Sequence, residues 1–173
     1  MAVGGLRAER RAGSDPADRT GFLRRRDRPH AAEWDRTETI ARSIVGRLAE
    51  LGFLAAALPE EHGGLGLDMV SYTLVVEEIG RADSNVRGIV SVSNGLYGKS
   101  VARWGTDEQK TRLLPALASG EALGCYALTE LGAGSDPGGL QTRAVRQGGD
   151  WVISGQKIFI TLGSWAANAL VFA

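Results

Sequence analysis

The hydrophobic pattern of this chain changes its period near Leu123. Before this point, apolar residues recur at spacings of three and four, which is typical of helices that bury one face. After it, short alternating runs are separated by glycine-rich turns, which is typical of strands. The pattern therefore predicts an α+β fold, with an all-α helical domain over residues 31–122 and the first strands of a β domain over residues 123–173.

Four helical stretches joined by short links are expected in the first part, which suits a compact helical domain. They cover residues 37–51, 68–82, 84–104 and 106–118. Gly52 is expected to end the first helix, and Asp68 to cap the second. The last helix opens with a capping box, in which Thr106 is the N-cap and Gln109 the third helical residue.

The second part is predicted to be built from short strands. Residues 123–129 and 168–173 are each expected to form a strand. Residues 141–146 and 151–154 are expected to pair as a hairpin across Gln147-Gly148-Gly149-Asp150. The outer strands would leave exposed edges.

A glycine-rich loop, YALTELGAGSD, spans residues 126–136. Such a loop lets backbone N–H groups approach a ligand closely, because glycine has no side chain. Pro137 stands where a dinucleotide fingerprint needs its third glycine, and strands rather than a helix are predicted next, so that fold is excluded. A phosphate-binding P-loop is excluded too, because no Gly-Lys-Ser/Thr follows.

The pattern Leu128-Thr129-Glu130, followed by Gly132-Ala133-Gly134-Ser135-Asp136, resembles the flavin-binding signature of the acyl-CoA dehydrogenase family. Residues 155–161 (GQKIFIT) resemble a second family element at the expected distance, and residues 59–64 (PEEHGG) also match. The resemblance covers about residues 30–173 and is nearest to the glutaryl-CoA and short-chain branch. It implies a helical domain, a β-barrel-like middle domain and a C-terminal helical domain, with this chain truncated inside the middle one.

The resemblance implies FAD-dependent α,β-dehydrogenation of an acyl thioester, carried by coenzyme A or by an acyl carrier protein. In this reaction a carboxylate removes the α-proton, the β-hydrogen leaves as hydride to the flavin, and electrons pass to a separate acceptor flavoprotein. Ser135 is also expected to reach the thioester substrate. The cofactor-binding residues implied by the resemblance are Tyr126, Leu128, Thr129, Gly134, Ser135, Phe159, Ile160 and Thr161.

Arg87 matches the place where the glutaryl-CoA branch has an arginine that anchors the far polar end of the substrate. There a serine follows, whereas here Gly88 follows, so a surface arginine stays open as the alternative. The catalytic glutamate of most of the family lies in the C-terminal domain. No catalytic residue is therefore expected in this chain, the isolated chain is expected to be inactive, and Glu130 is interpreted as a structural loop residue.

Two departures from the family pattern concern the predicted site. Leu131 replaces the usual proline, so the loop loses a fixed φ, and Leu162 replaces the usual asparagine after Thr161. Two other functions stay open, because the family's base and acceptor surface lie outside this chain and because the chain is expected to be truncated. One is a related flavin oxidase or monooxygenase with the same fold, and the other is a non-catalytic remnant.

Composition excludes several other classes of protein. A formal net charge of +0 does not point to nucleic acid, and the single Cys125 excludes an internal disulfide and a multi-cysteine metal site. No run reaches the roughly 18 apolar residues of a membrane helix, so a cytoplasmic enzyme is expected. The family resemblance implies a homo-oligomer in the full-length form. Residues 1–30 carry eight arginines against four acids and few apolar residues, which predicts a disordered or poorly packed tail.

Overall fold

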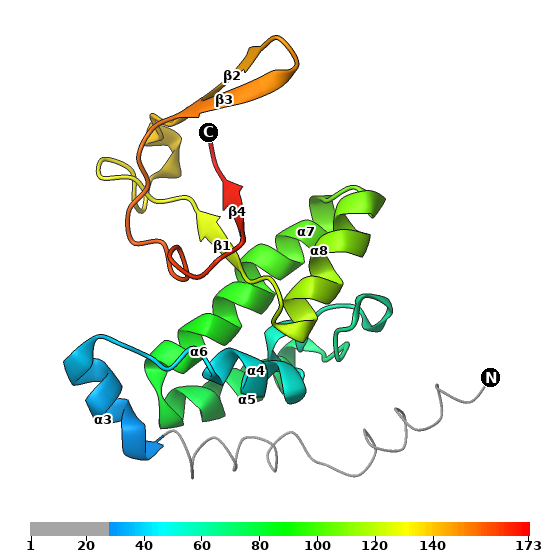
Figure 1. Cartoon of the computed structure of the whole chain (residues 1–173), viewed down its shortest axis with the longest axis vertical. Helices are drawn as coiled ribbons and strands as arrows, with labels where there is room; N and C mark the ends of the chain where they lie inside the picture. The colour runs from blue at the N-terminus through cyan, green and yellow to red at the C-terminus, as the bar shows by residue number, and fades with distance from the viewer. Residues whose placement is uncertain (1–27) are drawn as a thin grey trace.

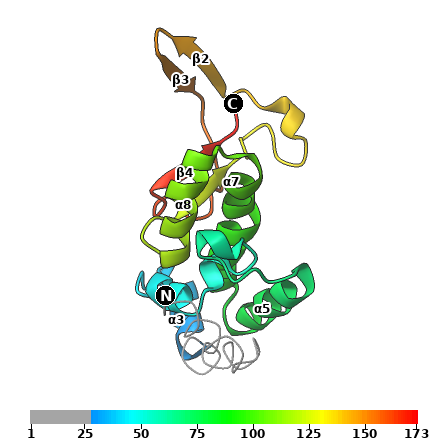
Figure 2. The ribbon, with the colours of Figure 1, turned by 90° about the vertical axis from the view of Figure 1, so that its right-hand side faces the viewer.

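The computed structural model describes residues 28–173, in which a body of helices carries two small sheets at one end (Figures 1 and 2). The predicted tail lies outside the described residues, except for its last three, which open the first described helix. The helices are α3 (Arg28–Thr37), α4 (Ile44–Glu50), α5 (Met69–Ala82), α6 (Ser84–Ser91), α7 (Lys99–Trp104) and α8 (Asp107–Ser119), with the π-helical η3 (Val92–Gly98) and the short 3-10 turns η1 (Phe53–Ala55), η2 (Glu60–His62) and η4 (Pro137–Gly139). The strands are β1 (Gly124–Ala127), β2 (Arg143–Gln147), β3 (Asp150–Ser154) and β4 (Asn168–Val171).

The core lies where α4, η1, α5, α6 and α8 meet. Its largest fully buried side chains include Leu48, Phe53, Leu54, Val75, Ile79, Leu114 and Leu117. The predicted helix signals are confirmed: Asp68 accepts from the N–H groups of Val70 and Ser71, and both bonds of the Thr106–Gln109 capping box are present. These caps satisfy N–H groups that have no partner within the helix.

The predicted helix over residues 37–51 is wrong in its first half. Helix α3 runs to Thr37, Glu38 takes a left-handed φ of 51°, and the next helix begins only at Ile44. The prediction failed because it counted Ile40 as part of an apolar helix face. In the structure, Ile40 packs against the core from the segment that connects α3 and α4. The end of the stretch is as predicted, since Gly52 follows α4 with a φ of 76°.

The predicted helix over residues 84–104 is confirmed, with an unexpected π-helical segment in its middle. Asn94 in this segment is fully buried and donates from Nδ2 to the carbonyls of Phe53 (2.6 Å) and Val90 (3.1 Å). Its Oδ1 accepts from the N–H of Ala57 at 2.9 Å. The π-helical segment η3 therefore places the Asn94 amide where it links this helix to η1 and to the residues just after η1.

The change from helices to strands is also confirmed. Strands β1 and β4 pair in parallel, from Gly124 beside Asn168 to Ala127 beside Val171. Strand β1 lies against η3 so closely that a Cβ at Gly124 would come within 2.2 Å of the Tyr97 ring. Cys125 is buried in this strand, as expected of a core residue.

Strands β2 and β3 form the predicted antiparallel hairpin, with Gly148 and Gly149 as its two turn residues. It projects away from the helices (Figures 1 and 2). The described strands thus form two separate two-stranded sheets, and their closure into a barrel stays a prediction. Within residues 28–173, no helix is long and apolar enough to cross a membrane, and no group of three or more metal-ligating side chains converges.

Candidate functional site

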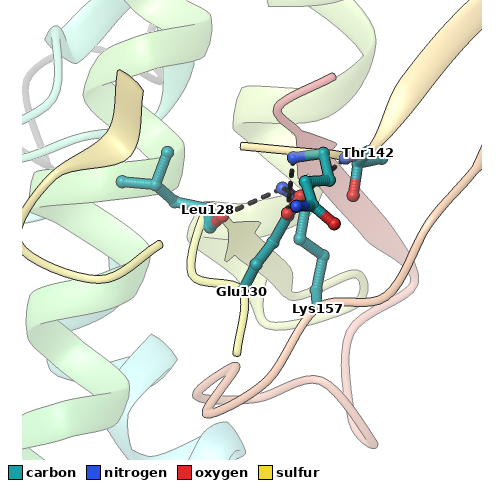
Figure 3. Close-up of polar contacts among 5 residues, drawn as sticks. Leu128, Glu130, Thr142 and Lys157 are labelled. Carbon is teal, nitrogen blue, oxygen red and sulfur yellow. Dashed lines mark hydrogen bonds and ion pairs between the residues drawn. The ribbon is translucent and has the colours of Figure 1, made fainter. Parts of the chain in front are cut away.

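A buried ion pair lies at the centre of the glycine-rich loop (Figure 3). The ammonium of Lys157 lies 2.8 Å from Oε1 of Glu130 and also donates to the carbonyl of Leu128 at 2.9 Å. The two oxygens of Glu130 accept from the N–H groups of Gln141 (2.7 Å) and Thr142 (2.9 Å). One carboxylate therefore joins three separate segments of the chain.

These contacts set the charge state of Glu130. The hydrogen bonds from Lys157, Thr142 and Gln141 lower the pKa of its carboxyl group from 4.5 to about 2. Hydrogen bonds to the charged form favour ionisation, and here they outweigh the opposing effect of burial. A carboxylate held so firmly in its ionised form is a poor proton acceptor near neutral pH. The geometry agrees with a structural role for Glu130 and not with that of a base.

The two sequence motifs are also joined through their backbones. The N–H of Ile158 donates to the carbonyl of Thr129 at 3.0 Å. The GQKIFIT segment therefore lies beside the end of β1, although Glu130 and Lys157 are 27 positions apart in the sequence. Sequence reasoning identified both motifs but missed the contact that makes them neighbours.

The loop after Glu130 presents its backbone to open space. Glu130 and Ala133 exchange backbone hydrogen bonds of 3.1 and 3.2 Å, which close a tight turn with Ala133 almost fully buried. No atom lies within 4 Å of a Cβ built on Gly132 or Gly134. The glycines thus leave room beside the main chain, and Ser135 next to them is exposed.

The second motif carries two residues in the left-handed backbone region. Phe159 has a φ of 56° and Leu162 a φ of 67°, on either side of Ile160 and Thr161. Non-glycine residues in this region are uncommon and concentrate at ligand sites. Phe159 as a residue is 89% exposed, which is unusual for a large apolar residue, and Thr161 is exposed too.

A cavity of about 330 Å³ separates this segment from the start of α6. Arg87 and Gly88 line one side of it, and Thr161 and Leu162 line the other. Arg87 is half-buried, and its guanidinium donates to the hydroxyl of Ser91 at 3.4 Å. The structure therefore brings Arg87 and Thr161 to one cavity, although they lie far apart in the sequence and were assigned separately, Arg87 to the substrate and Thr161 to the flavin.

Trp165 is a residue of this cavity that the sequence analysis missed. Arg42 donates to the Trp165 carbonyl at 3.2 Å, and its guanidinium carbon lies 5.7 Å from the centre of the indole ring. Ile40 lines the same cavity from the turn after α3. The only sequence signal for either residue was apolar character, which the core shares.

Tyr126 lies away from this cavity. It lines a second one, of about 490 Å³, between α7, α8 and the β1–β4 sheet, where its ring lies 4.8 Å from that of Phe172. The buried hydroxyl of Tyr97 on the same cavity has no hydrogen-bond partner among the described residues, and burial raises its pKa. The predicted site residues are thus divided between two cavities, with Tyr126 on one and Thr161 and Arg87 on the other.

Sequence comparison identifies the family. The profile of the acyl-CoA dehydrogenase N-terminal domain matches residues 18–121, and that of the acyl-CoA dehydrogenase middle domain matches residues 125–173. The chain belongs to the acyl-CoA dehydrogenase family. The glycine-rich loop and the GQKIFIT segment both lie in the part matched by the middle-domain profile.

Individual relatives agree with this assignment. A probable acyl-CoA dehydrogenase of Bacillus subtilis is 40% identical over 152 residues, covering 88% of this chain and 40% of that protein. The mitochondrial short-chain specific acyl-CoA dehydrogenase of Mus musculus is 41% identical over 143 residues, covering 83% of this chain and 34% of that protein. The crystal structure of a glutaryl-CoA dehydrogenase from Mycobacterium smegmatis in complex with FADH2 superposes with a TM-score of 0.86 at 37% identity, covering 95% of this chain and 44% of that one. The chain thus spans well under half the length of these relatives.

Proposed function

We propose that this chain forms the flavin-facing part of an enzyme that dehydrogenates an acyl thioester at its α and β carbons, with FAD as cofactor. The observation that carries the proposal is the Glu130–Lys157 ion pair, which holds the glycine-rich loop and the GQKIFIT segment together. A loop with open backbone and an exposed aromatic segment thereby become one surface. We also propose that residues 31–122 and 123–173 are two domains and that this surface belongs to the second.

The residues on this surface fit a flavin dinucleotide. Gly134 leaves open space beside the backbone for a phosphate or ribityl group, and the exposed hydroxyl of Ser135 supplies a hydrogen-bond donor. The exposed ring of Phe159 offers a flat apolar face for an aromatic ring system. The other residues that would hold the cofactor are Tyr126, Leu128, Thr129, Ile160 and Thr161. When bound, FAD would accept the hydride from the β carbon of the substrate.

The chain's own contribution to the reaction would be binding and orientation. The hydroxyl of Thr161 would donate a hydrogen bond to the polar edge of the flavin, and Ser135 would contact the thioester. Arg87 would orient a substrate whose far end is polar or anionic, because it lies across the 330 Å³ cavity from Thr161. No carboxylate of the described residues lines this cavity, so the group that removes the α-proton is proposed to come from elsewhere in the enzyme.

An electron-accepting flavoprotein is proposed to reoxidise the flavin, and the enzyme is proposed to work as a homo-oligomer. The names of the relatives support acyl-CoA as the substrate class, because the Bacillus subtilis and Mus musculus proteins are described as acyl-CoA dehydrogenases. Which acyl chain the enzyme accepts would depend on the group at the far end of the substrate, because that group would contact Arg87.

Flavin binding by residues 1–173 tests the proposal directly. Titration with FAD, followed by the quenching of flavin fluorescence, should show saturable binding without acyl-CoA-dependent dye reduction. Gly134→Val should weaken binding strongly, because its side chain fills the open space beside the loop backbone. Gly149→Val is the matched control, since that glycine is equally open but lies in the hairpin turn. Equal affinity in all three proteins, or no binding by the unchanged chain, would contradict the proposal.

A further inference from the structure

A tryptophan forms part of the wall of the cavity beside Arg87. Trp165 lines this cavity together with Arg87 and Thr161, and it also packs against the hydrophobic core. It lies in a tight turn, in which the carbonyl of Leu162 accepts hydrogen bonds from the N–H groups of Trp165 (2.9 Å) and Ala166 (2.8 Å). The backbone of Trp165 is therefore fixed at a defined place beside the cavity.

Arg42 contacts Trp165 from the segment that connects α3 and α4. Its guanidinium donates to the carbonyl of Trp165 at 3.2 Å, and its central carbon lies over the indole ring, 5.7 Å from the ring centre. A guanidinium within about 6 Å of an indole centre is attracted to the face of the ring. Arg42 thus binds both the backbone and the side chain of a residue that is 123 positions further along the chain.

The same connecting segment also reaches the cavity directly. Ile40, two residues before Arg42, lines the cavity and packs against the core. The segment therefore supplies one residue to the cavity wall and a second residue that holds another part of that wall, Trp165. A contact that served only to tie the strands to the helices would have no need to act on a residue of the cavity.

We propose that Trp165 determines which acyl groups the cavity accepts, and that Arg42 is the positioning residue that keeps its indole in place. The inference rests on the proposed function in one respect, since the cavity beside Arg87 would receive the far end of the acyl group. The indole is the largest of the side chains, so it leaves less room than any other residue would at this position. One methylene more or less in an apolar pocket changes discrimination by roughly 10–200-fold. Trp165 would therefore favour short acyl groups with a polar or anionic end.

NMR of residues 1–173 labelled with fluorotryptophan tests the positioning role. The four tryptophans give four fluorine resonances, and Trp165→Phe assigns the one of interest. Arg42→Ala should shift this resonance, because the ring loses the cation above it. Arg103→Ala is the matched control, since Arg103 lies over the ring of Trp104 at 4.9 Å and should shift only that resonance. An unchanged Trp165 resonance in Arg42→Ala, or an equal shift of it in Arg103→Ala, would overturn the positioning role.

The affinities for two dicarboxylic thioesters test the specificity role. Dissociation constants of residues 1–173 for glutaryl-CoA and for pimelyl-CoA, which is two methylenes longer, are measured from the broadening of the ligand's own NMR signals. The unchanged chain should bind glutaryl-CoA at least about tenfold more tightly. Trp165→Ala should remove this preference because it opens the wall, and Arg42→Ala should reduce it because it releases the indole. Trp165→Phe should keep most of the preference.

Trp151→Ala is the matched control for the affinities, because it removes the same side chain from the hairpin, where Trp151 is exposed. An unchanged ratio of dissociation constants in Trp165→Ala, a lost preference in Trp151→Ala, or binding of neither thioester would overturn the specificity role. The FAD titration with Gly134→Val involves neither Arg42 nor Trp165. A chain that binds FAD but shows one ratio in every variant would therefore overturn this inference and leave the proposed function intact.

Discussion

Replacement of Asn94 by alanine should be among the most destabilising single changes in the helical part of this chain. The side chain is fully buried and makes three hydrogen bonds, to Phe53, Val90 and Ala57. In Asn94→Ala the carbonyl of Phe53 and the N–H of Ala57 lose this partner. An unsatisfied buried polar group costs about 1–3 kcal/mol, so the two together should cost roughly 2–6 kcal/mol of unfolding free energy. This is a large part of the total stability of roughly 5–15 kcal/mol that is typical of a domain.

Ser93→Ala provides the matched control for this prediction. Ser93 is the neighbouring residue, is equally buried, and its hydroxyl has no hydrogen-bond partner among the described residues. Removing an unsatisfied buried hydroxyl should leave the stability unchanged or raise it. Urea unfolding followed by circular dichroism at 222 nm, a wavelength that reports helix, measures both variants. If Asn94→Ala unfolds at the same urea concentration as Ser93→Ala, the hydrogen bonds of Asn94 do not stabilise the π-helical segment.

Three further predictions follow from individual contacts. The pKa of Glu130 is about 2 in the folded chain against an ordinary 4.5, so its ionised form stabilises the fold above pH 4.5, and this contribution disappears as the pH falls toward 2. The difference in unfolding free energy between the unchanged chain and Glu130→Gln, measured by urea unfolding, should therefore shrink between pH 4.5 and pH 2. A difference that stays constant over this range would contradict the assignment. Gly124→Ala should lower the unfolding free energy by about 1–3 kcal/mol, because its Cβ would come within 2.2 Å of the Tyr97 ring, whereas Gly46→Ala, which meets no atom within 4 Å in α4, should raise it by roughly 0.5–1 kcal/mol. The Arg87 prediction needs a full-length relative that contains this N-terminal half. In that enzyme, Arg87→Ala should raise the KM for dicarboxylic acyl thioesters far more than the KM for acyl thioesters without a second carboxylate. Equal increases in both KM values would reject a role of Arg87 in substrate selection.

Local signals in the sequence predicted most of the fold. The Thr106–Gln109 capping box, the Asp68 cap and the two-glycine hairpin turn each depend on residues a few positions apart, and the structure has all three. The helix over residues 37–51 failed because an apolar stripe at helical spacing cannot distinguish a helix from a helix end followed by a turn. Ile40 has the right spacing, but it reaches the core from that turn.

The candidate site was only partly predictable, because its geometry depends on long-range contacts. The motifs around Thr129 and Thr161 were recognised from family patterns, yet nothing local indicated that Arg87 on α6 would line a cavity with Thr161. The contribution of Trp165 was missed for the same reason, since an isolated apolar residue in a loop has many possible partners. Hydrophobic periodicity reports which face of an element is buried, and it does not report which elements meet.

The place of Glu130 explains how the hairpin can project without disturbing the candidate site. Its carboxylate accepts hydrogen bonds from the N–H groups of Gln141 and Thr142 before the hairpin and from Lys157 after it, so both ends of the hairpin are fixed at one point. Gly155 reinforces this closure, because a Cβ there would come within 2.3 Å of the Thr142 hydroxyl oxygen, and only glycine allows the two chain segments to lie so close. The base of the hairpin and the loop at residues 130–135 are therefore fixed by the same carboxylate. Loss of the ion pair should disturb both, so Glu130 stabilises the backbone shape that the proposed ligand surface requires.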